Sequence, residues 1–327
     1  MKLRWLSISL IGAALLSSSA IANPLNLKAS NNSLQEVSTL PTQPTNASAS
    51  VFAGVVPLGK EISPLKAQVQ TLMTHYSFLQ PGMFFLDLET GNYLDINGEK
   101  VFPAASTIKF PILVALFEAV DSGRVKLNEP LVMRRDLIAS GSGTLQYERP
   151  GLRLSVLETA TKMITISDNT ATNMIIDRLG GKALLNERFH SWGLKNTVIH
   201  NLLGDFRGTN VTSPADLVRL AALITNHRLI SQESNSEVLD LMRHCVNKKL
   251  LADGLGSGAV IAHKTGDIGF LVGDAGIIDM PNGRHYLAGI FVRRPHDDER
   301  GREFVRRVSR IVYNYLDQQP MNITQQP

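Results

Sequence analysis

Three short motifs combine hydroxyl and amine side chains that could open an amide bond. In chain order they are Ser106-x-x-Lys109, Ser167-Asp168-Asn169 and Lys264-Thr265-Gly266. Opening an amide needs an activated hydroxyl, a proton path to the leaving nitrogen and donors for the oxyanion. A Ser-x-x-Lys match alone arises about once by chance in a chain this long. The three motifs together predict nucleophilic catalysis.

Ser106 and Lys109 lie at the start of the most apolar helix that the sequence predicts. Its apolar residues repeat at helical spacing: Ile112, Leu113, Leu116, Phe117 and Val120. Ser106 falls in the first turn, where unpaired N–H groups and the helix dipole favour negative charge. Lys109 shares its face, and burying its amine is costly unless the amine is used. We predict that Ser106 is the nucleophile and Lys109 its base, with a pKa lowered by the charge of Lys264.

The second motif lies between two helical patterns. A tight turn there could aim the Ser167 hydroxyl into a cleft, where we expect it to hand a proton to the leaving nitrogen. Asn169 can donate and accept hydrogen bonds and is expected to hold the substrate amide, while Asp168 braces the turn. One alternative is that Ser106 only caps its helix and that Lys109 lies along the surface, which would leave the two further motifs as coincidences. Another is that Ser167-Asp168-Asn169 is a helix cap alone.

The third motif follows a predicted strand, Val260 to His263. Lys264 and Thr265 would then place a cation and a hydroxyl at a strand edge that faces the helix. We expect Gly266 to let substrate approach the backbone, and the amides of Ser106 and Asp267 to form the oxyanion hole. His263 is predicted to be a strand residue without a catalytic role.

The basic run from Arg293 to Arg307 is typical of a solvated helix face. Arg293 or Arg294 is the exception, because either follows the last predicted strand and could bind a substrate carboxylate through two hydrogen bonds. Arg293 is our candidate for that contact.

Composition excludes several classes of protein. With 43% hydrophobic and 19% charged residues, the 327-residue chain can build a sizeable core. The sequence pI is 9.2, but no basic stripe interleaves with aromatic residues, so we do not expect nucleic-acid binding. The single cysteine, Cys245, excludes an internal disulfide and is predicted to pack in a helix core. We expect no cofactor and no metal.

The N-terminal region predicts export. Residues 1–22 have a basic start, an apolar run from Trp5 to Leu16 and a small-x-small cleavage site at Ala20-Ile21-Ala22, as in a signal peptide. The apolar run is short for a membrane span, so none is expected after cleavage. Residues 23–60, rich in Ser, Thr, Asn, Pro and Ala, are predicted to be a disordered linker. The mature protein would be a monomer in the periplasm or outside the cell.

The remaining patterns predict one domain over residues 61–319 and a tail over 320–327. Helices are expected near Ser63 to Tyr76 and at the C-terminal end, where Phe304, Val308, Ile311, Val312 and Tyr315 share a face. Predicted strands come from both chain ends: Met83–Leu88, Asn92–Ile96, Val260–His263, Ala275–Asp279 and Tyr286–Val292. This predicts an α/β (α+β) fold, with an antiparallel sheet flanked by helices over 61–124 and 252–319. Residues 125–251 would form an inserted all-α subdomain, with the site in the cleft between.

At these motifs the sequence resembles the class A β-lactamase family, from about Pro64 to Leu316. Further matches are Ser167 to Asn173, Gly180-Gly181, Thr212-Ser213-Pro214 and Asp298-Glu299-Arg300. The resemblance implies a β-lactamase/transpeptidase-like fold and an acyl-enzyme on Ser106.

Two departures from that family bear on the subtype. Class A β-lactamases carry a Glu-x-x-Leu-Asn element whose glutamate activates the deacylating water, but the matching stretch here, His200 to Arg207, has no glutamate. Asp205 is the candidate that could replace it. The second departure is Asp267, an acid where lactamases have a small or hydroxyl residue; it could recognise an amine of peptidoglycan. The pattern most resembles the PBP-A type D,D-peptidases.

We therefore predict a penicillin-binding D,D-peptidase that acts on peptidoglycan stem peptides and is acylated by β-lactams. One alternative is a class A-like β-lactamase that uses Asp205 or another water path. Another is a slow penicillin-sensing or wall-binding module, in which acylation serves recognition.

Overall fold

The computed structural model describes residues 51–320. The predicted signal peptide, residues 23–50 of the predicted linker and residues 321–327 of the predicted tail lie outside the described residues. Within the described part of the chain, no helix is both long and apolar enough to cross a membrane.

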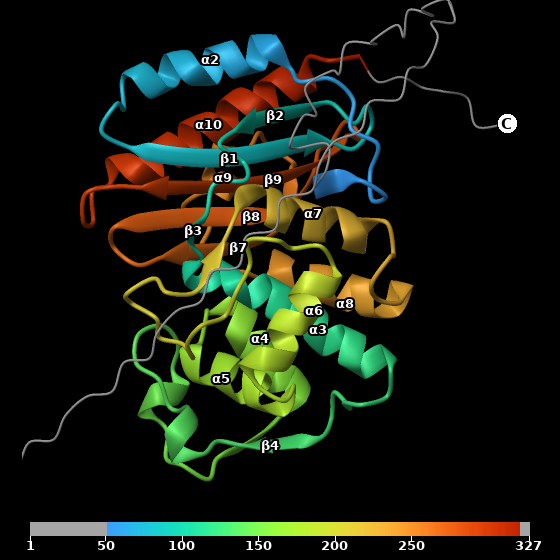
Figure 1. Cartoon of the computed structure of the whole chain (residues 1–327), viewed down its shortest axis with the longest axis vertical. Coiled ribbons are helices and arrows are strands. Elements are labelled where there is room, and N and C mark those ends of the chain that lie inside the picture. Colours follow the sequence, from blue (N-terminus) through green and yellow to red (C-terminus); the bar gives the residue numbers. More distant parts are fainter. Residues whose placement is uncertain (1–50, 321–327) are drawn as a thin grey trace, which may run out of the picture. The chain divides into compact units, whose positions relative to one another are not determined.

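A five-stranded antiparallel sheet in the order β2-β1-β9-β8-β7 forms the centre of the fold (Figure 1). Its strands are β1 (Gln80–Asp87), β2 (Tyr93–Ile96), β7 (Val260–Asp267), β8 (Leu271–Asp279) and β9 (His285–Arg293). The N-terminal and C-terminal parts of the domain meet where β1 pairs with β9, with Met83 opposite Ile290. The predicted fold class is confirmed. β7 extends beyond the predicted strand, so the Lys264-Thr265-Gly266 motif lies within it, at an edge of the sheet.

Two helices cover one face of this sheet, α2 (Ser63–Thr74) and α10 (Arg300–Asp317) (Figure 1). Toward the opposite face lie the other helices: α3 (Lys109–Asp121), α4 (Val156–Thr165), α5 (Asn169–Arg178), α6 (Lys182–Ser191), α7 (Pro214–Thr225) and α8 (Gln232–Arg243). The one-turn helix α9 (Leu251–Gly254) packs against α10. Capping residues that can be recognised in the sequence lie at the start of two of these helices. Ser155 and Glu158 form the capping box of α4, and Ser213 caps α7 ahead of Pro214.

Shorter elements connect the main ones. Two small antiparallel ribbons pair β3 (Phe102–Pro103) with β6 (Val211–Thr212), and β4 (Pro130–Val132) with β5 (Arg153–Ser155). Three 3-10 turns are η1 (Ala105–Ile108), η2 (Arg135–Leu137) and η3 (Leu145–Tyr147).

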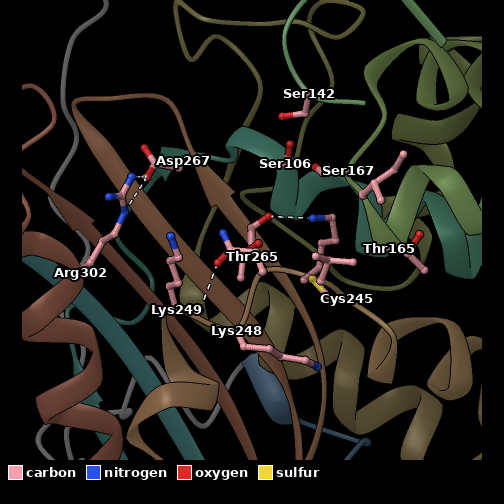
Figure 2. A pocket seen from close by; sticks show the side chains of 14 residues that line it. Ser106, Ser142, Thr165, Ser167, Cys245, Lys248, Lys249, Thr265, Asp267 and Arg302 are labelled. Carbon is pink, nitrogen blue, oxygen red and sulfur yellow. Dashed lines mark hydrogen bonds and ion pairs between the residues drawn. The ribbon is translucent and has the colours of Figure 1, made fainter. Parts of the chain in front are cut away.

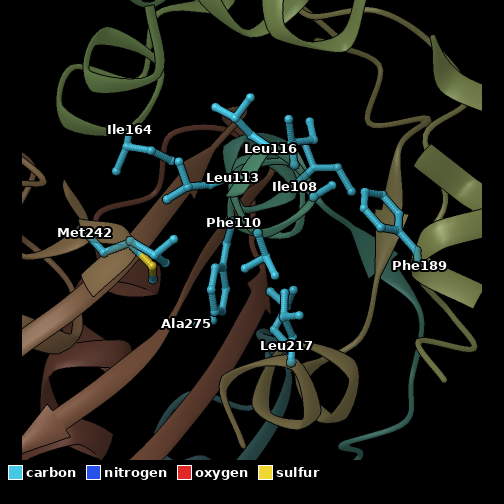
Figure 3. Close-up of a cluster of buried hydrophobic side chains, with 14 of the residues drawn as sticks. Ile108, Phe110, Leu113, Leu116, Ile164, Phe189, Leu217, Met242 and Ala275 are labelled. Carbon is cyan, nitrogen blue, oxygen red and sulfur yellow. The ribbon is translucent and has the colours of Figure 1, made fainter. Parts of the chain in front are cut away.

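Helix α3, the most apolar helix that the sequence predicts, is buried at every residue from Lys109 to Phe117. Figure 3 shows Phe110, Leu113 and Leu116 of α3 amid side chains from other elements: Ile164, Phe189, Leu217, Met242 and Ala275. Packing from every direction holds the helix, and with it Lys109 in its first turn, in one position.

The structure differs from two predicted boundaries. The linker prediction is wrong for residues 51–60, because Val51 and Phe52 are buried and the Phe52 ring stacks on Phe84 at 4.8 Å. Val55, Val56 and Leu58 also pack against the core, so apolar residues anchor a segment of otherwise linker-like composition. Helix α7 lies in the stretch predicted as a helical subdomain, yet it packs on the sheet, where Gly289 of β9 leaves room for Val218.

Candidate active site

Ser106 lies in the 3-10 turn η1, directly before α3, and not in the first turn of an α-helix as predicted. The residue before it, Ala105, has a φ of 46°, and Ser167 has a φ of 59°. Non-glycine residues rarely adopt such angles, and those that do cluster at functional sites where the surrounding fold enforces them. Ala105 directly precedes the first predicted motif, and Ser167 is the first residue of the second.

Lys109 connects the first two motifs. Its amine lies 3.0 Å from Ser106 Oγ and 3.0 Å from Ser167 Oγ. It also donates to the Ser167 carbonyl oxygen at 2.6 Å and to Asn169 Oδ1 at 2.8 Å. The side chain is 0% exposed. One buried amine thus bridges the two hydroxyls.

The buried position changes the acidity of Lys109. Burial, reinforced by the nearby charge of Lys264, holds the pKa of Lys109 well below that of an ordinary lysine, although Asp168 opposes the shift. Burial also lowers the pKa of Lys264, and in this case Cys245 and Asp274 oppose it. A lysine whose pKa is lowered in this way can serve as a base near neutral pH.

Asp168 braces the turn that presents Ser167, as predicted. One carboxylate oxygen caps α5 by accepting from the Ala171 amide at 2.9 Å. The other accepts from the amides of Thr144 and Leu145, at 2.7 and 2.9 Å. The carboxylate therefore joins the α4–α5 turn to the loop that carries Ser142.

The backbone amides of Ser106 and Asp267 are brought close together by Gly266. A Cβ at residue 266 would lie 3.0 Å from the Ser106 amide nitrogen, so only glycine permits this approach. The Ile268 amide donates to Leu271 across the β7–β8 ladder at 3.1 Å. Since antiparallel pairs alternate, the preceding residue, Asp267, turns its own N–H away from β8 and toward the open edge of the sheet.

A cavity of about 510 Å³ opens at this edge (Figure 2). Its lining includes Ser106, Ser167, Lys264, Thr265 and Asp267, so it unites residues from all three motifs. Lys264 is fully buried and donates to the Thr265 carbonyl oxygen at 3.0 Å. The arrangement can bring a carbonyl carbon to the Ser106 hydroxyl with two amides nearby.

Some predicted substrate contacts are placed differently. Asn169 does not line the cavity, because its side chain bridges Lys109 and the Ser140 carbonyl oxygen, to which it donates at 2.9 Å. Gly266 lies against the backbone of Ser106. Arg293 does not line the cavity either, whereas Arg302 does.

The two acids singled out in the sequence are both occupied within the protein. Asp205 accepts from Thr209 Oγ1 at 2.8 Å and from the Asn210 amide at 2.7 Å, and it does not line the cavity. Asp267 is paired with Arg294 and Arg302. Both carboxylates are therefore hydrogen-bonded within the protein, Asp205 away from the cavity and Asp267 at its lining.

Sequence reasoning missed one wall of the cavity. It comprises Cys245, Val246, Asn247, Lys248 and Lys249, which follow α8. Cys245 is buried as predicted, but it lies beyond the end of α8 and not on its core face. Arg302 was hidden in a basic run that resembled a solvated helix face. Within residues 51–320, no three His, Cys, Asp or Glu side chains group as metal ligands would.

Comparison with known proteins places this geometry in context. A model of the Beta-lactamase enzyme family matches residues 64–316. A point mutant of PBP-A, solved as an acyl-enzyme complex with penicillin G, is 54% identical with a TM-score of 0.79; the match covers 81% of this chain and 100% of that chain. The extended-spectrum beta-lactamase PER-1 of Pseudomonas aeruginosa is 24% identical over 237 residues, 67% of this chain and 77% of the relative. Beta-lactamase CARB-3 of Pseudomonas aeruginosa is 28% identical over 199 residues, 58% of this chain and 68% of the relative.

Proposed function

Because this chain belongs to the beta-lactamase enzyme family and is a β-lactamase-like serine hydrolase, we propose that it is an exported D,D-peptidase that forms an acyl-enzyme on Ser106. Its proposed substrate is the D-Ala-D-Ala end of a peptidoglycan stem peptide, and β-lactams acylate the same serine. The observation that carries the proposal is the buried Lys109 amine, which contacts the hydroxyls of both Ser106 and Ser167. The PBP-A mutant, solved with bound penicillin, supports it.

In the acylation step, Ser106 Oγ attacks the carbonyl carbon and its proton passes to the neutral Lys109 amine. The negative charge that develops on the carbonyl oxygen is stabilised by the N–H groups of Ser106 and Asp267. Lys264 stays protonated, so its charge keeps the pKa of Lys109 low and favours substrate negative charge in the cavity.

The intermediate then collapses and the carbon–nitrogen bond breaks. The Ser167 hydroxyl gives its proton to the leaving nitrogen and is reprotonated by Lys109, which returns to its neutral form. A peptide leaving group departs as free D-alanine. Water then attacks the ester, releases the shortened peptide and restores the Ser106 hydroxyl.

A β-lactam leaves a longer-lived adduct, because its leaving nitrogen stays tethered to the acyl group after the ring opens. Its hydrolysis needs a base that activates water against the ester. Leu203 occupies the loop where the resemblance places a glutamate, and Asp205 is hydrogen-bonded within its own loop. This is the reason for proposing a peptidase over a β-lactamase.

Intact-protein mass spectrometry after mixing with benzylpenicillin tests the proposal, with Ser106→Ala alongside. We expect an adduct of penicillin mass that persists for minutes and is absent from the variant. We also expect release of D-alanine from a peptide that ends in D-Ala-D-Ala.

Other outcomes identify the alternatives. Rapid loss of the adduct with multiple turnovers of nitrocefin identifies a β-lactamase. A stable adduct without D-alanine release identifies a penicillin-sensing module. Folded wild-type protein that never forms an adduct eliminates Ser106 as the nucleophile.

Export and the monomeric state are part of the proposal. Export is supported by the signal-peptide pattern of residues 1–22. N-terminal sequencing of the protein from the periplasmic fraction should begin just after Ala22, and light scattering should give the mass of one mature chain. A retained Met1 would contradict cleavage at this site.

A further inference from the structure

The Asp267 carboxylate is held from several directions. It accepts from the Gly269 amide at 3.0 Å and from Arg294 Nη2 at 2.8 and 3.0 Å. Arg302 donates to the same carboxylate through Nε at 3.1 Å and Nη2 at 2.7 Å. Two guanidinium groups already balance the charge of this one acid, which leaves no unpaired charge for a substrate amine.

Arg294 fixes this carboxylate to the body of the protein. Its side chain is 0% exposed. Besides Asp267, it donates to the carbonyl oxygens of Gly269 at 2.8 Å and Asp298 at 3.0 Å. It therefore ties the end of β7, the β7–β8 turn and the segment before α10 into one unit. Arg302 adds a second tie from the first turn of α10 and, at 27% side-chain exposure, borders the cavity.

Position 267 needs such support because β7 is an edge strand. β7 is hydrogen-bonded to β8 on one side only, and the Asp267 N–H points to the open side. No strand can hold that amide in place, since a strand on that side would fill the cavity. The side chain of the same residue supplies the restraint instead, through its pairs with Arg294 and Arg302.

We propose that Asp267 is a positioning residue and that Asp267, Arg294 and Arg302 form a clamp that fixes the residue-267 amide for oxyanion binding. The clamp rests on the acyl-enzyme function proposed above. It acts through the backbone and not through contact between the Asp267 carboxylate and substrate.

The test compares Asp267→Ala and Asp267→Asn in the full chain. The readout is the second-order rate constant of acylation by benzylpenicillin, with the melting temperature followed in parallel. Asp267→Ala releases the whole clamp and is expected to slow acylation about 10²-fold, the usual effect of a misplacement of about 1 Å. Asp267→Asn keeps one oxygen to accept from Gly269 and Arg294, so it should recover most of this loss.

A pair of substrates separates positioning from recognition. One substrate is an acylated depsipeptide with a free terminal carboxylate, and the other is its C-terminal amide. The Asp267→Ala variant should be acylated by both more slowly than wild type, and by the same factor, because both reactions need the oxyanion hole. A loss confined to the free-acid substrate would overturn the clamp and show instead that Asp267 orients Arg302 to bind the substrate carboxylate. An Asp267→Ala rate within twofold of wild type would also overturn it while leaving the acyl-enzyme intact.

Arg300→Ala is the matched control. Arg300 also lies in the first turn of α10 and pairs with Asp298, but it does not line the cavity. The Arg300→Ala variant should be acylated at the wild-type rate. If its acylation rate falls as much as that of Asp267→Ala, the effect belongs to α10 in general and the clamp is rejected. Wild-type protein that forms no adduct rejects the underlying function and the clamp together.

Discussion

Gly266 packs so closely against Ser106 that a Cβ at position 266 would lie 2.9 Å from Ala105 Cβ and 3.0 Å from the Ser106 amide nitrogen. Contacts this short force one of the two segments to move. Since oxyanion stabilisation depends on donors 2.7–3.1 Å from the oxyanion, this approach between β7 and η1 sets the spacing of the two amides.

Gly266→Ala should therefore slow acylation by benzylpenicillin about 10²-fold, because the added methyl separates the Ser106 and Asp267 amides. Stopped-flow or quenched mass spectrometry would measure the rate. Gly151→Ala is the control: its φ of 97° makes alanine strained, but a Cβ there meets no atom within 4 Å and the residue does not line the cavity. Equal losses in both variants would show that general destabilisation, and not the contact between Gly266 and Ser106, slows the reaction.

The acylation rate should follow a bell-shaped pH profile. Lys109 must be neutral to accept the Ser106 proton, so the rate rises as pH increases through its strongly lowered pKa. Lys264 must be charged, so the rate falls at higher pH as Lys264 deprotonates, at a pKa that burial also lowers. A pH series of acylation rates from about pH 4 to 10 covers both limbs.

Lys109→Met should remove the acidic limb and lower the rate about 10³-fold, within the range for loss of a general base. A variant that keeps the acidic limb would show that another group takes the proton.

Leu203→Glu should shorten the lifetime of the penicilloyl adduct at least about tenfold, since a general base accelerates ester hydrolysis. The backbone at residue 203 is held by Asn173, which accepts from its amide at 2.8 Å and donates to its carbonyl oxygen at 2.6 Å. The next residue, Gly204, lies against Asn169, the partner of Lys109. Time-resolved mass spectrometry of the adduct gives the lifetime.

Two controls make that test specific. Leu203→Gln has the size without the charge, and Leu202→Glu puts the same charge on the neighbouring side chain, which is 38% exposed. Faster deacylation in either control would show that charge at position 203 is not the cause.

Asp87→Ala should lower the free energy of unfolding by about 3–5 kcal/mol, because it leaves the buried Arg284 without a counter-charge. Arg284 Nη1 donates to Asp87 Oδ2 at 2.6 Å, and the two side chains are 1% and 4% exposed. Urea denaturation measures the change. The double variant Asp87→Ala/Arg284→Met should lose less than the single one, and a larger loss in the double variant would contradict the counter-charge explanation.

The sequence alone determined the fold class, the apolar helix that begins at Lys109 directly after Ser106, and the main chemical groups of the site. These depend on local signals: apolar periodicity, capping residues and short motifs with fixed spacing. For the same reason the capping role of Asp168 could be predicted, since Ala171 lies close in the chain. Its contacts with the amides of Thr144 and Leu145 depend on tertiary structure.

Only the tertiary structure decided which groups each polar side chain meets. Asn169 is held between Lys109 and Ser140, and Asp267 is paired with Arg294 and Arg302. Sequence spacing carries no information about partners that belong to other elements. Hydrogen-bond partners depend on how strands and helices pack, so the same residue types could equally have faced the substrate. The lowered pKa of Lys109 likewise exists only after α3 is buried and Lys264 is brought beside it.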